Sequence, residues 1–271
     1  MANIDEISIS TCIIKCQTGD GKKLLDSLYR IGEAGYKMVE MSLYMPDGDT
    51  EKIMDKVSDT GVQVWSVHGF LGMGAISPDE AERDKAVELA YRHAAVFARF
   101  APCPLVEHYL DRHSDRKVAD YFRDSIWKLY EKVSALGYTM CLETAPYKPK
   151  MYDRHPDSLE IAEFVRSFGK DDLQMIVDIN HSNLSENLLD TAKNTRGLVK
   201  NIHVSNNNGT WEDHLPPNEG VIDIKQAFEA FRANGYTGPC NLEFGFPDDR
   251  EPSVEKMRAM REYMENLLWQ R

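Results

Sequence analysis

Residues 139–146 read TMCLETAP, a run of apolar and β-branched residues that ends at a glutamate and a turn-prone proline. The same pattern recurs three times further along the chain, in LQMIVDINH (173–181), VKNIHVSNN (199–207) and PCNLEFGF (239–246). Each segment is typical of a buried β-strand followed by a loop. At or near the end of each strand stands a residue that can bind a metal: Glu143, Asp178, His203 and Glu243. The four segments therefore predict strands that each present one such side chain at the loop end.

Strand and helix patterns alternate along the whole chain. Strands are predicted at 7–13, 36–44, 62–70, 104–110, 139–145, 173–179, 199–205 and 239–245. Helices are predicted between them, at 20–35, 49–61, 77–100, 114–137, 157–169, near 185–196, at 223–235 and at 251–270. Eight such units of roughly 30 residues predict a parallel sheet and match the size of a (β/α)8 barrel. We therefore expect an α/β protein that is a single (β/α)8 TIM barrel over residues 1–271. A doubly wound open sheet is the alternative, but no G-x-G-x-x-G or phosphate-loop pattern favours it.

The predicted barrel would bring the four strand-end residues together, because active sites of such barrels lie at the carboxyl ends of the strands. A buried carboxylate is costly to desolvate unless it is paired or bound to a cation. Three carboxylates and one imidazole suit one divalent ion, with Mn²⁺ preferred and Mg²⁺, Co²⁺ or Zn²⁺ as alternatives. The competing interpretation is that Glu143 and Glu243 form salt bridges with Lys or Arg.

Three histidines form a second set of candidates at the same predicted face. His68 ends the third strand, His108 ends the fourth, and His181 lies just past the sixth. We expect these side chains to contact the substrate, and ligation of further metal ions is the alternative.

The loop after the seventh strand carries two more candidates for substrate binding. It reads HLPPNEG at 214–220, and its two prolines stiffen it. It would place His214 or Glu219 over the site, although a purely structural connection is an equally good interpretation.

Composition limits the classes of function and partner. The chain has 271 residues, of which 42% are hydrophobic and 28% are charged, as in ordinary globular proteins. No apolar run reaches the roughly 20 residues that cross a bilayer, and the N-terminus lacks the features of a signal peptide. Five scattered cysteines suit a reducing compartment, so we expect a cytoplasmic protein with no membrane partner. The net charge of −12 argues against a nucleic-acid partner, whereas homo-oligomer formation stays open.

At these residues the chain resembles the xylose isomerase-like TIM-barrel superfamily, which includes the sugar phosphate isomerase/epimerase family and is related to endonuclease IV. The most specific parts of the resemblance are LETAP, VDINH, IHVSNNNGTWEDHLPPNEGVID and NLEF. The resemblance implies that Glu143, Asp178, His203 and Glu243 are the metal ligands. It also implies that the two glutamates are the catalytic acid–base pair and that His181 contacts the substrate.

The resemblance further implies a metal-dependent isomerase or epimerase whose substrate is a small ketose or keto-polyol. The metal would stabilise the enediolate that forms when an α-proton leaves, and the two glutamates would remove and return that proton. Dehydration of a keto-polyol would begin with the same step, so a dehydratase is an alternative. Ketohexose 3-epimerases carry a further glutamate after the strand-five ligand and an arginine after the strand-seven histidine. This chain reads TAPYKPK and SNNNG in those places, which argues against a free ketohexose as substrate.

The endonuclease IV branch provides the main rival, a zinc phosphodiesterase acting on abasic DNA. The ligands of its three-zinc site would correspond to His68, His108, His181, His203, His214, Glu143, Asp178, Glu212 and Glu243. Three features favour the isomerase or epimerase instead. The first strand lacks the HVS start of those nucleases, the loops lack clustered Arg and Lys for phosphates, and the net charge is strongly negative.

Overall fold

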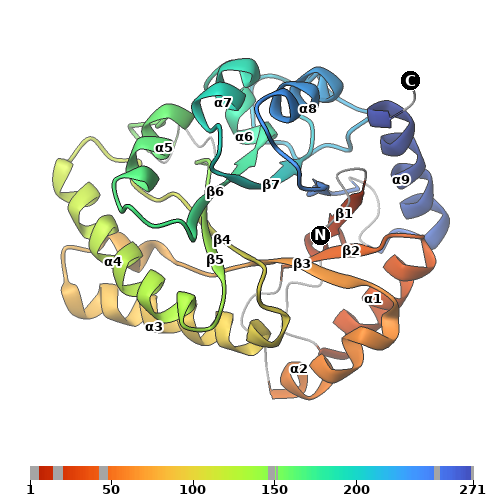
Figure 1. The fold of residues 1–271 in the computed structure, drawn as a ribbon, viewed down its shortest axis with the longest axis horizontal. Helices are drawn as coiled ribbons and strands as arrows, with labels where there is room; N and C mark the ends of the chain where they lie inside the picture. Colours follow the sequence, from red (N-terminus) through yellow and green to blue (C-terminus); the bar gives the residue numbers. More distant parts are fainter. Residues whose placement is uncertain are drawn as a thin grey trace.

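A computed structural model describes residues 6–14, 21–42, 48–145, 150, 152–246 and 251–269 of the chain. The strands found there are β1 (Ile7–Ser10), β2 (Met38–Ser42), β3 (Gln63–His68), β4 (Pro104–His108), β5 (Thr139–Glu143), β6 (Leu173–Asp178), β7 (Val199–Val204) and β8 (Cys240–Leu242). They close into one barrel in chain order, and every neighbouring pair is parallel. Figure 1 shows this barrel inside a ring of helices. The predicted (β/α)8 barrel is therefore confirmed.

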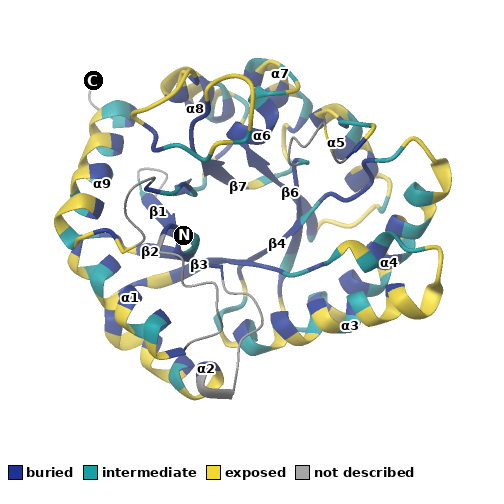
Figure 2. Cartoon of the chain, turned by 180° about the vertical axis from the view of Figure 1, so that it is seen from behind, coloured by how far each residue is buried: buried dark blue, intermediate teal, exposed yellow. Residues whose placement is uncertain are grey.

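The helices cover the outer face of the barrel. They are α1 (Gly21–Glu33), α2 (Gly48–Ile53), α3 (Glu80–Phe97), α4 (Arg116–Ser134), α5 (Ser158–Arg166), α6 (Ile179–Asn183), α7 (Leu188–Asn194), α8 (Ile224–Ala233) and α9 (Val254–Trp269). Their apolar residues recur at helical spacing, as with the buried Leu24, Leu28 and Ile31 of α1. Figure 2 shows exposed residues on the outer sides of these helices and buried residues along the strands. Within the described ranges, no helix is both long and apolar enough to cross a bilayer.

Two predicted elements end earlier than their patterns suggest. The strand predicted at 7–13 stops at Ser10 and continues as a 3-10 helix, η1 (Thr11–Ile14). The Thr11 hydroxyl both donates to the carbonyl of Ser42 and accepts from its amide, so a side chain takes over the role of backbone pairing. The helix predicted at 49–61 is α2 followed by a 3-10 segment, η2 (Met54–Thr60), which ends at Gly61 with φ 76°.

The barrel interior is polar, whereas the main apolar core lies outside it. That core packs strand residues against α1, α3, α4, α5, α8 and α9. Inside, a small separate cluster consists of Val106, Cys141 and Ile176, each two residues before a strand end and therefore on the same face as that end. Several further strand residues are fully buried although they are polar: Ser8, Ser10, Glu40, Ser66, Asn201 and Asn241. The polar interior lies directly beneath the candidate ligands.

Candidate metal centre

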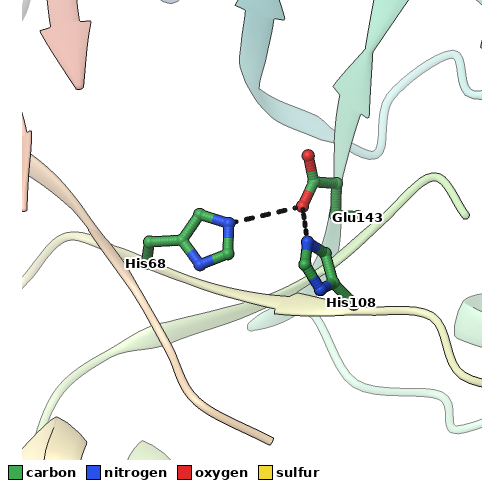
Figure 3. Close-up of side chains that lie close together, drawn as sticks. All are labelled: His68, His108 and Glu143. Atoms are coloured by element: carbon green, nitrogen blue, oxygen red, sulfur yellow. Dashed lines mark ion pairs between the residues drawn. The ribbon is translucent and has the colours of Figure 1, made fainter. Parts of the chain in front are cut away.

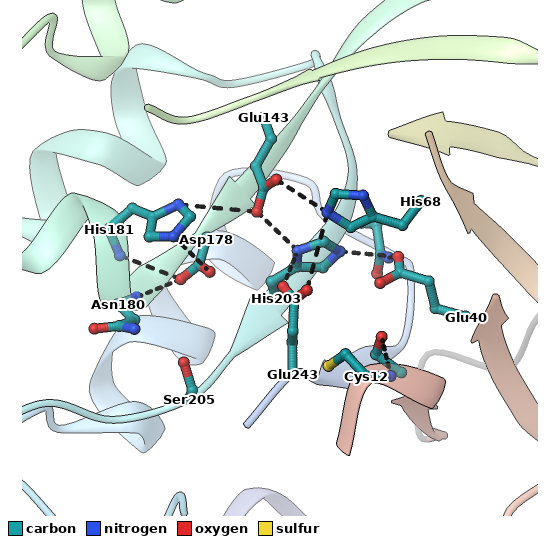
Figure 4. Close-up of polar contacts among 12 residues, drawn as sticks. Cys12, Glu40, His68, Glu143, Asp178, Asn180, His181, His203, Ser205 and Glu243 are labelled. Carbon is teal, nitrogen blue, oxygen red and sulfur yellow. Dashed lines mark hydrogen bonds and ion pairs between the residues drawn. The ribbon is translucent and has the colours of Figure 1, made fainter. Parts of the chain in front are cut away.

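The four strand-end residues predicted as ligands converge at one point. Glu143, Asp178, His203 and Glu243 each offer one ligand atom, and these atoms all lie within 4.8 Å of one another. The Nδ1 atom of His203 lies 2.9 Å from Oε1 of Glu143 and 2.6 Å from Oε2 of Glu243 (Figure 4). The first three side chains are fully buried, and that of Glu243 is 12% exposed. The side chains come from β5, β6, β7 and the residue after β8.

A second group of donors lies on one side of this point. The Nε2 atom of His108 is 3.1 Å from Oε2 of Glu143, and that of His68 is 3.6 Å away (Figure 3). These three residues form a further set whose ligand atoms fit around one ion. The geometry therefore allows His68 and His108 to ligate a metal, and their contact with a substrate stays a prediction.

A third group lies on the other side. Asp178, His181 and His214 bring their ligand atoms within 4.8 Å of one another. Oε1 of Glu212 lies 4.0 Å from Nε2 of His181 and 3.8 Å from Nε2 of His214. Because Glu143 belongs to two groups and Asp178 to two, the three groups form a continuous chain of donors.

The donor set fits a divalent cation. Oε2 of Glu143 and Oδ2 of Asp178 are buried and accept no hydrogen bond from the described residues. Among the described residues, every ion pair formed by Glu143, Asp178 or Glu243 has a histidine as its partner. The alternative that the glutamates form salt bridges with Lys or Arg therefore finds no support in this part of the chain. Carboxylate oxygens and imidazole nitrogens are ligands for Mn²⁺, Co²⁺ and Zn²⁺ alike.

Asp178 is oriented by the short helix that follows it. Its Oδ1 accepts hydrogen bonds from the backbone N–H groups of Asn180 at 2.6 Å and His181 at 3.2 Å, which caps α6. The Nδ1 atom of His181 lies 3.0 Å from the carbonyl oxygen of Thr144. These bonds leave Oδ2 of Asp178 and Nε2 of His181 directed toward each other, 3.4 Å apart.

Side-chain amides hold the loop between β7 and α8. The Asn206 side-chain oxygen accepts from the backbone N–H groups of Asn207 and Ile222, both at 2.9 Å, and so closes the loop on itself. Asn207 donates to the side chain of Asn180 in α6 at 2.7 Å. The asparagines of SNNNG thus tie the loop that carries His214 to the helix that carries His181.

His214 has a backbone conformation that non-glycine residues rarely adopt, with φ 48°. Its Nδ1 atom lies 3.1 Å from the carbonyl oxygen of Glu243 and 3.3 Å from the hydroxyl of Ser205. These contacts direct Nε2 toward the third group. Strained conformations of this kind are found most often at functional sites.

Neighbouring charges shift the pKa values of the cluster in opposite directions. Burial alone would lower the pKa of His203, His68 and His214, but the carboxylates beside them raise it. The pKa rises to about 10 for His68 and to about 10 for His214, and well above its usual range for His203. Burial alone would raise the pKa of Glu243 and Glu143. The histidines instead lower it, to about 2 for Glu243 and well below its usual range for Glu143.

One predicted site residue lies outside the cluster. Two buried carboxylates near the cluster were not predicted from the strand-end pattern. Glu219 is exposed and lies outside the three donor groups formed by the described residues, so its role in substrate binding stays a prediction. Glu40 in β2 and Glu107 in β4 are buried close to candidate ligands. Each is a single acidic residue inside an apolar strand, and that pattern is the signal that could have found them.

A sequence profile of the family described as xylose isomerase-like TIM barrel matches residues 28–266. The chain belongs to the xylose isomerase-like TIM barrel family. This assignment confirms the resemblance carried by the strand-end motifs.

Several sugar epimerases are similar to this family member. An L-ribulose-5-phosphate 3-epimerase of Shigella boydii serotype 18 is 22% identical over 260 residues, which are 88% of each chain. A solved L-ribulose 3-epimerase superposes with a TM-score of 0.81 and 17% identity, covering 99% of this chain and 95% of that one. A D-psicose 3-epimerase from Clostridium cellulolyticum H10 superposes with a TM-score of 0.74 and 12% identity, covering 97% and 99%. At such identities the solved structures show a shared fold.

In this xylose isomerase-like barrel, Glu107 holds the loop that follows His68. Its Oε2 accepts a hydrogen bond from the backbone N–H of Leu71 at 2.7 Å, and the N–H of Gly69 donates to the carbonyl of Val106 at 2.7 Å. A Cβ atom at Gly69 would lie 2.1 Å from Oε1 of Glu107. Only glycine therefore fits where the loop crosses this carboxylate.

Replacing Gly69 with alanine should force the loop or Glu107 to move. Overpacking of this kind costs about 1–3 kcal/mol of unfolding free energy, measurable by urea denaturation. Gly72→Ala is the matched control, because a Cβ there would meet nothing within 4 Å. Equal urea midpoints for the two variants would contradict the tight packing around Glu107.

Metal binding should release protons near neutral pH. The raised pKa of His203 means that the metal-free imidazole is protonated, and a ligand nitrogen must lose that proton. The affinity for the metal should therefore rise as the pH rises. Titration calorimetry with Mn²⁺ in buffers of different ionisation enthalpy measures the proton count, and a binding enthalpy independent of buffer would contradict the expectation.

Proposed function

We propose that this protein is a divalent-metal-dependent isomerase or epimerase acting on a ketose or keto-polyol. Family membership and the similarity to sugar 3-epimerases support this activity class. The ion, with Mn²⁺ preferred, would be held by Glu143, Asp178, His203 and Glu243. The partner is a small sugar or polyol, and a dehydratase that shares the first chemical step stays as a variant of the proposal.

The observation that carries the proposal is the pairing of two glutamates across one ion site. Glu143 and Glu243 both contact Nδ1 of His203, and Figure 4 shows them reaching it from opposite sides. A planar intermediate bound between them would have a carboxylate at each face. Such an arrangement suits removal of a proton from one face and its return to the other.

In the metal-free protein the histidines lower the pKa of Glu143 and Glu243, so both glutamates are ionised near neutral pH and able to take up a proton. A divalent ion would supply the electrostatic stabilisation that loss of a proton next to a carbonyl requires. One protonated glutamate can return its proton at the neighbouring carbon, which is isomerisation. Inversion at a single carbon requires the second glutamate to enter the cycle already protonated. The imidazoles of His68, His108 and His181 would form hydrogen bonds with substrate hydroxyls.

Glu143→Gln and Glu243→Gln should each abolish turnover while the fold survives. Loss of a positioned acid or base lowers the rate roughly 10²–10⁴-fold. The assay is NMR detection of product from L-ribulose, L-ribulose 5-phosphate and D-psicose, the sugars named for the relatives.

Glu131→Gln is the control, since Glu131 is exposed on α4. Exchange of the α-proton with deuterium from solvent separates the two roles, because a variant lacking only the returning acid still exchanges. Near wild-type turnover in either variant would remove that glutamate from the proposed acid–base pair.

A specific observation favours a second candidate, a zinc phosphodiesterase acting on abasic DNA. The three donor groups are linked through Glu143 and Asp178, and Glu212 lies beside the third group. This arrangement has room for more than one ion. The number of ions therefore separates the two candidates.

We expect one divalent ion per chain on the purified protein, measured by inductively coupled plasma mass spectrometry. That ion should be lost in Glu143→Ala and His203→Ala variants, because both residues contribute to the central group. Two or three zinc ions per chain, together with nicking of abasic-site DNA, would favour the phosphodiesterase. No bound metal after reconstitution would contradict both candidates.

A further inference from the structure

Glu40 is a buried carboxylate on the far side of His203 from the predicted ion. It lies on β2, whereas the four predicted ligands come from the ends of β5 to β8. It is fully buried, and its Oε2 atom is 2.9 Å from Nε2 of His203 (Figure 4). It belongs to none of the three donor groups that the described residues form. Glu40 therefore contacts a candidate ligand without being one.

Two other strands hold this carboxylate in place. The hydroxyl of Ser66 on β3 donates to Oε2 at 2.6 Å, and the side-chain amide of Asn201 on β7 donates to the same atom at 3.2 Å. Asn201 also donates to the Ser66 hydroxyl at 3.2 Å. Oε2 thus lies at the centre of a hydrogen-bonded network that spans the barrel interior and cannot move independently of it.

The contact between Glu40 and His203 sets which imidazole nitrogen of His203 is available to bind a metal. A carboxylate accepts hydrogen bonds, so Nε2 of His203 must carry the proton that points to Glu40. The other nitrogen, Nδ1, is the atom that contacts Glu143 and Glu243 at the central group. When one imidazole nitrogen binds a metal through its lone pair, the other nitrogen carries the proton. The group that accepts a hydrogen bond from that N–H fixes the orientation of the ring.

Fold stability does not explain the presence of this carboxylate. Among the described residues its ion pair is with His203, and no lysine or arginine neutralises it. Its second oxygen, Oε1, is buried and accepts no hydrogen bond within the part of the chain that the structure describes. An apolar side chain of similar size would avoid the desolvation cost. A charge kept at such a position indicates a role in the site.

We propose that Glu40 is a positioning residue that holds His203 in the Nε2–H tautomer and aims Nδ1 at the metal. The proposal rests on the metal site of the proposed function. Glu40, His203 and the ion would form a carboxylate–histidine–metal relay, with Ser66 and Asn201 fixing the carboxylate.

The test is the affinity for Mn²⁺ alone, measured by competition with a fluorescent chelator. Glu40→Leu should bind Mn²⁺ roughly 10–100-fold more weakly than the wild type, the usual effect of removing such a partner. Glu40→Gln keeps an acceptor without the charge and should lie between the two. Glu186→Gln is the control, since it removes a partly buried, hydrogen-bonded carboxylate outside the donor groups.

Two further measurements separate positioning from a structural role. Long-range ¹H–¹⁵N NMR of the zinc-loaded protein should show the Nε2–H proton of His203 hydrogen-bonded to a carboxylate in the wild type, and therefore at lower field than in Glu40→Leu, where that acceptor is missing. The melting temperature of the metal-free Glu40→Leu protein should be equal to or above that of the wild type. An affinity for Mn²⁺ within about twofold of wild type with an unchanged His203 Nε2–H signal would overturn the proposal. A lowered metal-free melting temperature that alone accounts for weaker binding would also overturn it.

If Glu40→Leu does not fold, the affinity for Mn²⁺ and the His203 NMR signal of Glu40→Gln test the proposal instead. Weaker binding with a shifted His203 signal supports the relay, and no change in either overturns it. Failure of the wild type to bind metal would instead contradict the proposed function, so the two failures are distinguishable.

Discussion

Negative charge buried in the mouth of the barrel is the constraint on which the rest of the site depends. Glu40, Glu143 and Glu243 surround the imidazole of His203, and all four side chains are almost fully removed from water. Desolvating three carboxylates costs more free energy than one imidazolium can return. The arrangement is stable only where more positive charge is available, from other protonated histidines or from bound cations. Hydrogen bonds from Ser66 and Asn201 to Glu40 help to keep these groups together despite that cost.

Stability must therefore come from outside the barrel. Barrels of this kind usually fill their interior with branched apolar residues, but here Ser66, Asn201 and Asn241 occupy fully buried strand positions. The main apolar core lies instead between the strands and the surrounding helices, as the buried inner faces in Figure 2 indicate. This division lets the interior carry polar groups that orient ligands, because the helical layer supplies the burial of apolar surface that folding requires.

Local patterns in the sequence were enough to predict the barrel and the convergence of four strand-end side chains, since each ends an apolar strand and parallel strands share one face. The contacts of His68 and His108 with Glu143 depend on how three strands lie around the closed barrel, and no local pattern encodes that. Glu40 was not predicted as part of the site, because an acidic residue inside a strand is equally consistent with a solvent-facing position. The early end of β1 depends on the bonds of Thr11 to a residue 31 positions away. Long-range pairing thus accounts for what the sequence did not reveal.

Charge balance connects the number of ions to the kind of substrate. Five buried or nearly buried carboxylates line the mouth: Glu40, Glu143, Asp178, Glu212 and Glu243. One divalent ion offsets two of these charges. In the metal-free protein the raised pKa of His68 and His214 keeps both protonated near neutral pH, which offsets two of the five charges. Three ions with neutral histidines would instead leave it positive, which suits a phosphodiester anion. One ion beside two imidazoliums would leave a slightly negative site, and such a site would suit the hydroxyls and carbonyl of an uncharged sugar.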